Sequence, residues 1–231
     1  FSPDGDLLYV ASTGQFDQAG RDDVGGPGYV FAYDWRSGDT IGFFETGPKP
    51  IGITAAPQGS GENYVAVAVR GAENGGVLII DTVSQRVVNA IDTNLRGAEP
   101  TEILANSPAA LGLALASGST NNPNLGQTRT SSGQPLVLFD INGAESIAFM
   151  PDGSYAFVMF NNTWDPKNQS TDPFLGAGSN IGILRDPFGD AQWVGATTQV
   201  PHAWGDELVV GPDNAKLYAS MRGVNEVHVY N

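Results

Sequence analysis

The sequence predicts an all-β protein made of repeated antiparallel sheets, and three observations lead to this. A proline-centred turn recurs five times along the 231 residues. Short strands rich in Val, Ile, Leu and Tyr follow these turns, bounded by Gly, Pro, Asn and Asp. No long segment shows the 3.6-residue apolar period of an amphipathic helix. The 30 Gly and 15 Pro agree with a chain that turns often.

The turns share a pattern in which Pro fixes one backbone angle and a neighbouring Gly, Asn or small residue completes the bend. The five copies are Phe1–Gly5, Ala55–Gly59, Asn106–Ala110, Phe149–Gly153 and Val210–Asn214. Because each copy stands in a matching context of strands, we interpret them as one structural repeat rather than as chance turns.

Each turn is preceded by an innermost strand and followed by a second and a third strand, the third often ending in Asp. The predicted second strands are Leu8–Ser12, Tyr64–Ala68, Leu113–Ala116, Tyr155–Met159 and Leu217–Met221. The predicted third strands are Tyr29–Asp34, Val77–Asp81, Leu136–Asp140, Ile181–Leu184 and Val227–Tyr230. A fourth strand is visible at 40–44, 86–91 and 192–196. Four antiparallel strands per repeat predict a β-propeller.

The approximate repeats are 1–50, 51–100, 101–143, 144–205 and 206–231, which together form one domain. We expect about five blades, the first and last of them partial, because no innermost strand precedes Phe1 and no fourth strand follows Tyr230. Two interpretations remain open. The blades belong to a larger propeller of about seven or eight blades, completed by further blades of the same polypeptide, or five blades close alone or with a partner chain.

Phe1–Ser12, Val77–Ile91 and Leu208–Tyr230 resemble the YVTN-type repeat family, whose units run as a Ser-Pro-Asp-Gly turn, a Leu-Tyr-Val strand and a Val-x-Val-Ile-Asp strand. The resemblance extends over all five repeats and is weakest in 101–143. It implies a propeller fold, found in surface proteins and in lactonases, with quinoprotein or haem-linked dehydrogenases among similar propellers. It does not assign a chemistry, since propellers host many functions.

Composition excludes several classes of protein. There is no Cys, so a disulfide scaffold and a thiolate metal site are ruled out. Acidic residues number 25 against 11 basic ones, for a net charge of −14, which argues against nucleic acid as a partner. No apolar run approaches the ~20 residues of a membrane helix, so membrane insertion is not expected. An acidic chain without Cys suits an extracellular, cell-surface or periplasmic location.

The long connections fall on one face of the predicted propeller, between second and third strands and between blades: Thr13–Gly28, Ser117–Gln134, Asn161–Asn180 and Thr197–Asp206. We predict that this face binds a protein or a carbohydrate ligand. Its loop aromatics would stack on sugars or a partner protein, or else cover the core beneath a loop; they are Phe16, Trp164, Phe174 and Trp204. Asn161-Asn162-Thr163 also fits the N-glycosylation acceptor pattern.

Two sets of acidic residues are candidate metal ligands. Asp17, Asp22 and Asp23 lie in a Gly-rich loop and offer carboxylate oxygens to Ca²⁺, although their spacing matches no calcium-binding motif. Near the starts of innermost strands, a ring of carboxylates at the channel mouth is formed by Glu99, Glu102, Glu145 and Glu207. The alternative for both sets is ordinary solvated acids, and no cofactor is required.

A catalytic set is weakly represented. His202 with Asp206 would form an acid–base pair, although a lone His more often has a structural role. There is no Gly-x-Ser-x-Gly, His-Glu-x-x-His or phosphate-binding motif. The sequence therefore favours a non-catalytic scaffold within a larger surface or secreted protein. The alternative is a propeller enzyme, a lactonase-type hydrolase or a quinoprotein-like oxidoreductase, with its site at the channel mouth.

Overall fold

The computed structural model confirms the all-β prediction. It describes residues 1–13, 28–47, 49–70, 76–92, 127–129, 135–137, 144–164, 177–197, 200–201, 203–212 and 214–231. Within these ranges the one helical segment is the short 3-10 turn η3 (Arg222–Val224), and none of their residues forms a helix long and apolar enough to cross a membrane.

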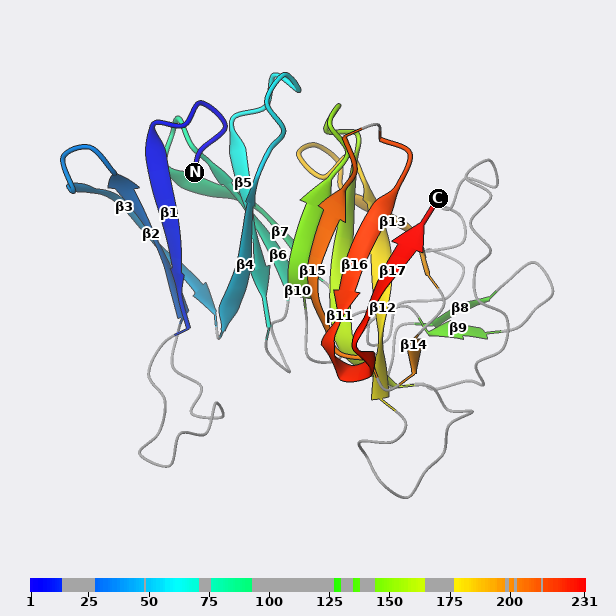
Figure 1. Ribbon diagram of the computed structural model, residues 1–231. Coiled ribbons are helices and arrows are strands. Elements are labelled where there is room, and N and C mark those ends of the chain that lie inside the picture. The colour runs from blue at the N-terminus through cyan, green and yellow to red at the C-terminus, as the bar shows by residue number, and fades with distance from the viewer. Residues whose placement is uncertain are drawn as a thin grey trace, which may run out of the picture.

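Four antiparallel sheets form the body of the molecule and stand side by side (Figure 1). The first contains β1 (Leu7–Ser12), β2 (Gly28–Asp34) and β3 (Thr40–Gly47). The second contains β4 (Pro50–Ala55), β5 (Tyr64–Val69), β6 (Gly76–Asp81) and β7 (Arg86–Asp92). The third contains β10 (Ala144–Phe149), β11 (Tyr155–Trp164), β12 (Ala177–Arg185) and β13 (Gln192–Ala196), with β14 (Val200–Pro201) beside β12. The fourth contains β15 (Gly205–Val210), β16 (Leu217–Met221) and β17 (Glu226–Tyr230).

The sheets pack as propeller blades do. In chain order, β1 contacts β4, β4 contacts β10, and β10 contacts β15, so the leading strands of successive sheets lie next to one another. The second and third sheets have four main strands, and the described strands of the first and last sheets number three each.

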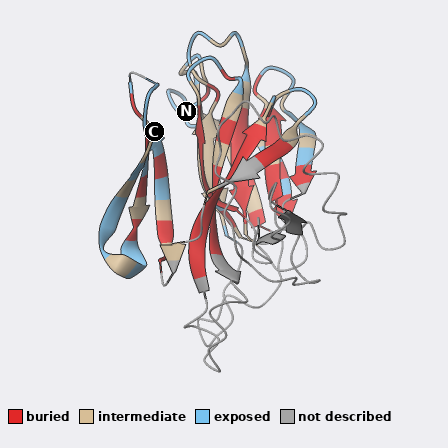
Figure 2. Ribbon diagram, turned by 90° about the vertical axis from the view of Figure 1, so that its right-hand side faces the viewer, coloured by how far each residue is buried: buried red, intermediate tan, exposed pale blue. Residues whose placement is uncertain are grey.

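Three apolar clusters lie between the sheets, one in each interface (Figure 2). In β5, Val65, Val67 and Val69 face the first sheet, whereas Ala66 and Ala68 face the third. Because both faces of such a sheet are covered, its strands are continuous apolar runs rather than alternating ones. This explains why β5 reads Tyr-Val-Ala-Val-Ala-Val.

The repeat at 101–143 lies outside the described residues except for β8 (Gln127–Arg129) and β9 (Pro135–Val137), which pair only with each other. The sheets on either side of it in the sequence contact each other directly. Thr54 Oγ1 donates to the carbonyl of Ile147 at 2.7 Å. A Cβ on Gly52 would stand 2.8 Å from the carbonyl oxygen of Glu145, so glycine is needed where β4 approaches β10.

The proline turns close the upper end of the sheets in Figure 1. In the turn at Pro151, the carboxylate of Asp152 accepts hydrogen bonds from the Ser154 backbone N–H at 3.0 Å and from the Ser154 hydroxyl at 2.6 Å. Gly153 has φ 75°, a conformation that glycine adopts without a steric penalty. At the opposite, lower end in Figure 1, β1 and β11 end and β2 and β12 begin; the connections between them lie outside the described residues, so the predicted face of long connections stays a prediction.

Candidate functional site

Polar side chains gather at the lower end of the sheets, where β5, β11 and β16 end and where β10 and β15 begin. Each of these strand ends supplies a polar group from a different part of the sequence. The cluster, called here the loop-end cluster, consists of Arg70, Glu145, Ser146, Asn161, Ser179, Trp204, Asp206, Glu207 and Arg222.

Arg70 is the centre of the loop-end cluster. It directly follows β5, and its Nη1 lies 3.6 Å from Oε2 of Glu145 at the start of β10. The Arg70 guanidinium also stands over the ring of Trp204, 4.8 Å from the ring centroid. A cation over an aromatic face is stabilised by the ring quadrupole, more so when water is excluded. Arg70 therefore connects the second sheet, the third sheet and the segment leading into the fourth.

Glu145 is a buried carboxyl, with 8% of its surface exposed. Burial raises the pKa of Glu145 above its ordinary value, because the charged form loses its hydration. The charge of Arg70 and a hydrogen bond from Asn161 oppose this rise. Among the described residues, no group donates a hydrogen bond to Oε2 of Glu145. The carboxyl thus takes up a proton more readily than an exposed glutamate does.

Asn161 holds the start of β15 against the third sheet. Its Nδ2 donates to the carbonyl of Gly205 at 2.7 Å, and its Oδ1 accepts from the Gly205 N–H at 2.7 Å. The Gly205 N–H also lies 2.9 Å from the hydroxyl of Ser179, which in turn lies 2.6 Å from Asn161 Oδ1. A Cβ on Gly205 would overlap the thioether of Met159. The side-chain amide of Asn161 therefore binds the backbone N–H and C=O of Gly205 as the backbone of a neighbouring strand would.

The carboxylates of β15 are also bound within the cluster. The hydroxyl of Ser146 donates to Glu207 Oε2 at 2.9 Å and accepts from the backbone N–H of Leu208 at 3.2 Å. Asp206 Oδ1 lies 3.3 Å from Nη2 of Arg222, in a more exposed ion pair. Two carboxylates of the cluster, Glu145 and Asp206, thus stand beside arginines, and Glu207 is held by a hydroxyl.

Most of the residues singled out from the sequence lie outside the described residues, and their predicted roles stay predictions. They are Phe16, Asp17, Asp22, Asp23, Glu99, Glu102, Phe174 and His202. The predicted pairing of His202 with Asp206 and the Ca²⁺ site are among these.

The structure does bring two members of the predicted carboxylate ring to one place. Glu145 and Glu207 both lie at starts of adjacent leading strands and share Ser146 as a neighbour. Glu145 is not a solvated rim residue, however, since it is buried beside Arg70. Among the described residues, no group of three or more His, Asp or Glu side chains stands close enough to hold a metal ion.

The loop predicted at Asn161–Asn180 is shorter in the structure. β11 continues to Trp164 and β12 begins at Ala177, with Trp164 opposite Ala177. Trp164 therefore belongs to a strand rather than to a loop. Asn161 is buried and hydrogen-bonded, which makes it inaccessible as a glycosylation acceptor. The polar residues interrupted the apolar pattern, but pairing across strands continues through backbone groups, which every residue type supplies.

Trp204 was predicted either to stack on a ligand or to cover the core. In the structure its ring is half-buried beneath Arg70. Five residues of the cluster were not among the site residues predicted from the sequence: Arg70, Ser146, Asn161, Ser179 and Arg222. Arg70 carried a usable signal, because a charge that directly follows a wholly apolar strand is held close to the core.

No protein-family model matches the chain, and no curated protein sequence matches it; the YVTN-type resemblance therefore stays a prediction. Solved structures that match include hydrazine synthase of Kuenenia stuttgartiensis, at a TM-score of 0.46 and 17% identity, over 99% of this chain and 62% of that one. The periplasmic gluconolactonase of Pseudomonas aeruginosa matches at a TM-score of 0.40 and 15% identity, over 99% of this chain and 66% of that one. The chain spans less than two thirds of the length of either protein.

Proposed function

We propose that this chain is a non-catalytic β-propeller scaffold, a module of a larger surface or secreted protein, that binds a protein or carbohydrate ligand with the loops at its lower end. The loop-end cluster is the observation that supports this. Arg70 pairs with Glu145 across the second and third sheets and stands over Trp204, which leads into the fourth, while the amide of Asn161 and the hydroxyls of Ser146 and Ser179 bind backbone. Such a cluster holds a rigid frame from which the long connections leave.

Composition supports a location outside the cytoplasm, whether extracellular, on the cell surface or in the periplasm. The 25 acidic and 11 basic residues keep the surface hydrated, and the absence of Cys removes any dependence on the redox state of the compartment. The scaffold needs no cofactor, and Ca²⁺ bound by Asp17, Asp22 and Asp23 would add order to one loop without taking part in chemistry.

Loop exchange tests this proposal. Residues 14–27 are replaced by a Gly-Ser linker of equal length, and a matched control adds the same Gly-Ser pairs to the turn Trp35–Gly38 at the opposite end. Binding of carbohydrates is measured by calorimetry with hexasaccharides of glucose, mannose and N-acetylglucosamine as probes. Binding of proteins is measured by crosslinking to the surface proteins of the cell that produces this chain. We expect the loop exchange to weaken binding at least about tenfold and the control to leave it unchanged. Equal binding by the two variants contradicts the proposal.

A propeller hydrolase or oxidoreductase is the second candidate, and the buried Glu145 favours it. A carboxyl with a raised pKa and an oxygen that accepts no hydrogen bond from the described residues has the properties of a general acid or base. Gluconolactone hydrolysis and dye-linked sugar oxidation distinguish the two functions. The scaffold proposal expects equal background rates for the unchanged protein and for Glu145→Gln. A rate that the unchanged protein shows and Glu145→Gln loses establishes the enzyme instead.

A further inference from the structure

An arginine, a tryptophan and a carboxylate meet at each end of the sheets, and the group at the turn end, where the proline turns lie, has its hydrogen bonds complete. There the guanidinium of Arg36 lies over the ring of Trp35, 4.7 Å from the ring centroid. Its Nη1 donates to Oδ1 of Asp6 at 2.9 Å, and Nε1 of Trp35 donates to the carbonyl of Gly5 at 3.0 Å. The Arg36 and Asp6 side chains are more than half exposed, so water reaches their remaining polar atoms.

The matching group at the lower end is buried, and its hydrogen bonds are incomplete. Nη1 of Arg70 lies 3.6 Å from Oε2 of Glu145, which is too far for a direct hydrogen bond. Among the described residues, nothing donates to that oxygen and nothing accepts from Nε1 of Trp204, although both atoms are buried. Buried polar atoms are ordinarily hydrogen-bonded, so two such exceptions beside one guanidinium indicate a further binding partner.

The three side chains define the chemistry of this partner. Trp204 and Arg70 only donate hydrogen bonds, whereas ionised Glu145 only accepts them. A hydroxyl group does both, and one hydroxyl oxygen about 2.8 Å from each atom bridges Arg70 and Glu145 across their separation of 3.6 Å. It also accepts from Glu145 when the carboxyl is protonated. A second, neighbouring hydroxyl supplies the acceptor for Trp204, and neighbouring hydroxyls are characteristic of sugars.

The charges of the loop-end cluster favour a neutral ligand. The guanidinium of Arg70 is offset by the carboxyl of Glu145, and that of Arg222 by Asp206. The whole chain carries a net charge of −14, so its field does not attract anions. The Arg70 side chain keeps 20% of its surface exposed, and its guanidinium is therefore the part of the group that a ligand reaches first.

We propose that the loop-end cluster binds a neutral sugar through two neighbouring hydroxyls, one between Arg70 and Glu145 and the other on the indole N–H of Trp204. The inference rests on the proposed function, because it names the class of ligand and the place where a carbohydrate is held. The hydrogen bonds between Asn161 and Gly205 fix the segment that carries Trp204 against the third sheet, so the donor is positioned before the sugar binds.

NMR titration of the 231-residue protein with glucose, galactose, mannose and N-acetylglucosamine tests the inference. The indole N–H signal of Trp204, assigned with Trp204→Phe, should shift saturably with at least one of these sugars. The signal of Trp35 should stay unchanged, because its N–H already donates to Gly5. Absence of a saturable shift at Trp204 with all four sugars overturns the inference, and so does tighter binding of glucuronate than of glucose.

The two matched groups provide the protein variants. Arg70→Met and Glu145→Ala should each weaken sugar binding at least about tenfold, because each removes a hydrogen bond to the ligand. Arg36→Met and Asp6→Ala, the same changes at the turn end, should weaken it less than about twofold. Where a variant of the buried group unfolds, Trp204→Phe replaces it, since phenylalanine keeps an aromatic ring under the guanidinium and removes only the donor. Equal losses at the two ends overturn the inference.

The outcome also separates this inference from the proposed function. Carbohydrate or protein binding that is lost when residues 14–27 are exchanged, but kept by Trp204→Phe, overturns the sugar site and leaves the scaffold proposal standing. Sugar binding that Trp204→Phe weakens, but that the exchange of 14–27 leaves unchanged, establishes the site and contradicts the assignment of binding to the loops.

Discussion

Both faces of the third sheet carry an apolar cluster, but at the lower end of β11 the two faces are closed by different chemistry. Consecutive residues of β11 point to opposite faces, as strand geometry requires. Phe160 is buried in the apolar cluster shared with the second sheet, beside Trp193 at a ring distance of 5.8 Å. Asn161, the next residue, faces the start of β15 and binds the backbone of Gly205.

This difference separates two tasks. Apolar clusters supply buried area, which stabilises without specifying a direction. The hydrogen bonds of Asn161 lie at the lower end of the face that also carries the apolar cluster shared with the fourth sheet, and because they are directed they set where β15 begins relative to β11. The third sheet thus obtains cohesion from apolar clusters on both faces and alignment from polar contacts at the lower end of one of them.

The largest expected effect on stability comes from the apolar cluster between the second and third sheets. Phe160→Ala should lower the free energy of unfolding by about 3–5 kcal/mol, because it leaves a cavity in a fully buried position. Phe43→Ala is the matched control, since Phe43 is 58% exposed and should lose less than about 1 kcal/mol. Urea denaturation measures both, and similar losses for the two variants would show that the interface with the second sheet does not carry the stability.

Asn161→Ala tests the polar contacts between β11 and the start of β15. It should lower the free energy of unfolding by about 1–3 kcal/mol, because the buried carbonyl of Gly205 loses its donor. Asn63→Ala, at an exposed position, should change stability by less than about 0.5 kcal/mol. Hydrogen exchange gives the sharper measurement. The loss of protection in Asn161→Ala should concentrate at β15, and a loss spread evenly over the molecule would contradict an aligning role.

The raised pKa of Glu145 predicts a smaller effect on stability, and this effect depends on pH. Its pKa is raised in the folded protein, so the folded state holds the proton over a range where the unfolded state has released it. Stability contributed by this group is therefore present below its ordinary value of 4.5 and is lost as pH rises through the raised folded pKa. The stability of the unchanged protein should fall relative to that of Glu145→Gln as pH rises above 4.5. A constant difference across that range would contradict the raised pKa.

At the turn end of the same sheet, Asp152 should give the opposite dependence of stability on pH and the smallest effect of the four. Hydrogen bonds from Ser154 lower the pKa of Asp152 below its ordinary value of 3.8. The contribution of Asp152 is present above 3.8 and is lost as pH falls through the lower folded pKa. The small loss in Asp152→Ala should thus be measurable above pH 3.8 and shrink as pH falls below it. Persistence of the loss in acid would locate it in the turn backbone instead.

Much of the fold could be predicted because its signals are local. The second strand predicted at Tyr64–Ala68 is β5 (Tyr64–Val69), and the strand predicted at Leu217–Met221 is β16 with the same bounds. Apolar runs and proline turns specify such elements over a few residues. The candidate site was less accessible to sequence reasoning, because its members pair across sheets that are distant in the sequence, as Ser146 does with Glu207.

The end of β11 illustrates the same limit of sequence reasoning. Asn161, Asn162 and Thr163 have the composition of a loop, yet backbone pairing continues to Trp164, because hydrogen bonds of the main chain do not depend on side-chain polarity. Burial of Asn161 depends on Gly205 and Ser179, which lie 44 and 18 residues away. No pattern around Asn161 contains that information.

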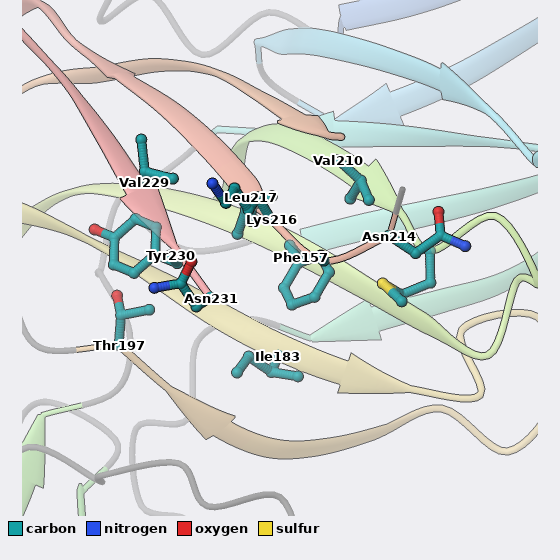
Figure 3. A pocket seen from close by; sticks show the side chains of 12 residues that line it. Phe157, Ile183, Thr197, Val210, Asn214, Lys216, Leu217, Val229, Tyr230 and Asn231 are labelled. Carbon is teal, nitrogen blue, oxygen red and sulfur yellow. The ribbon is translucent and has the colours of Figure 1, made fainter. Parts of the chain in front are cut away.

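The amino-acid sequence by itself determined the strands, the proline turns, the order of the blades and the end of the molecule from which the long connections leave, because each follows from backbone preferences and apolar patterning over short spans. Only the tertiary structure decided that Glu145 is buried beside Arg70, that Asn161 aligns β15, and that Phe157 and Leu217 line one groove between the third and fourth sheets (Figure 3). These depend on which sheet faces come together, and the energy of such contacts comes from partners that the local sequence does not specify.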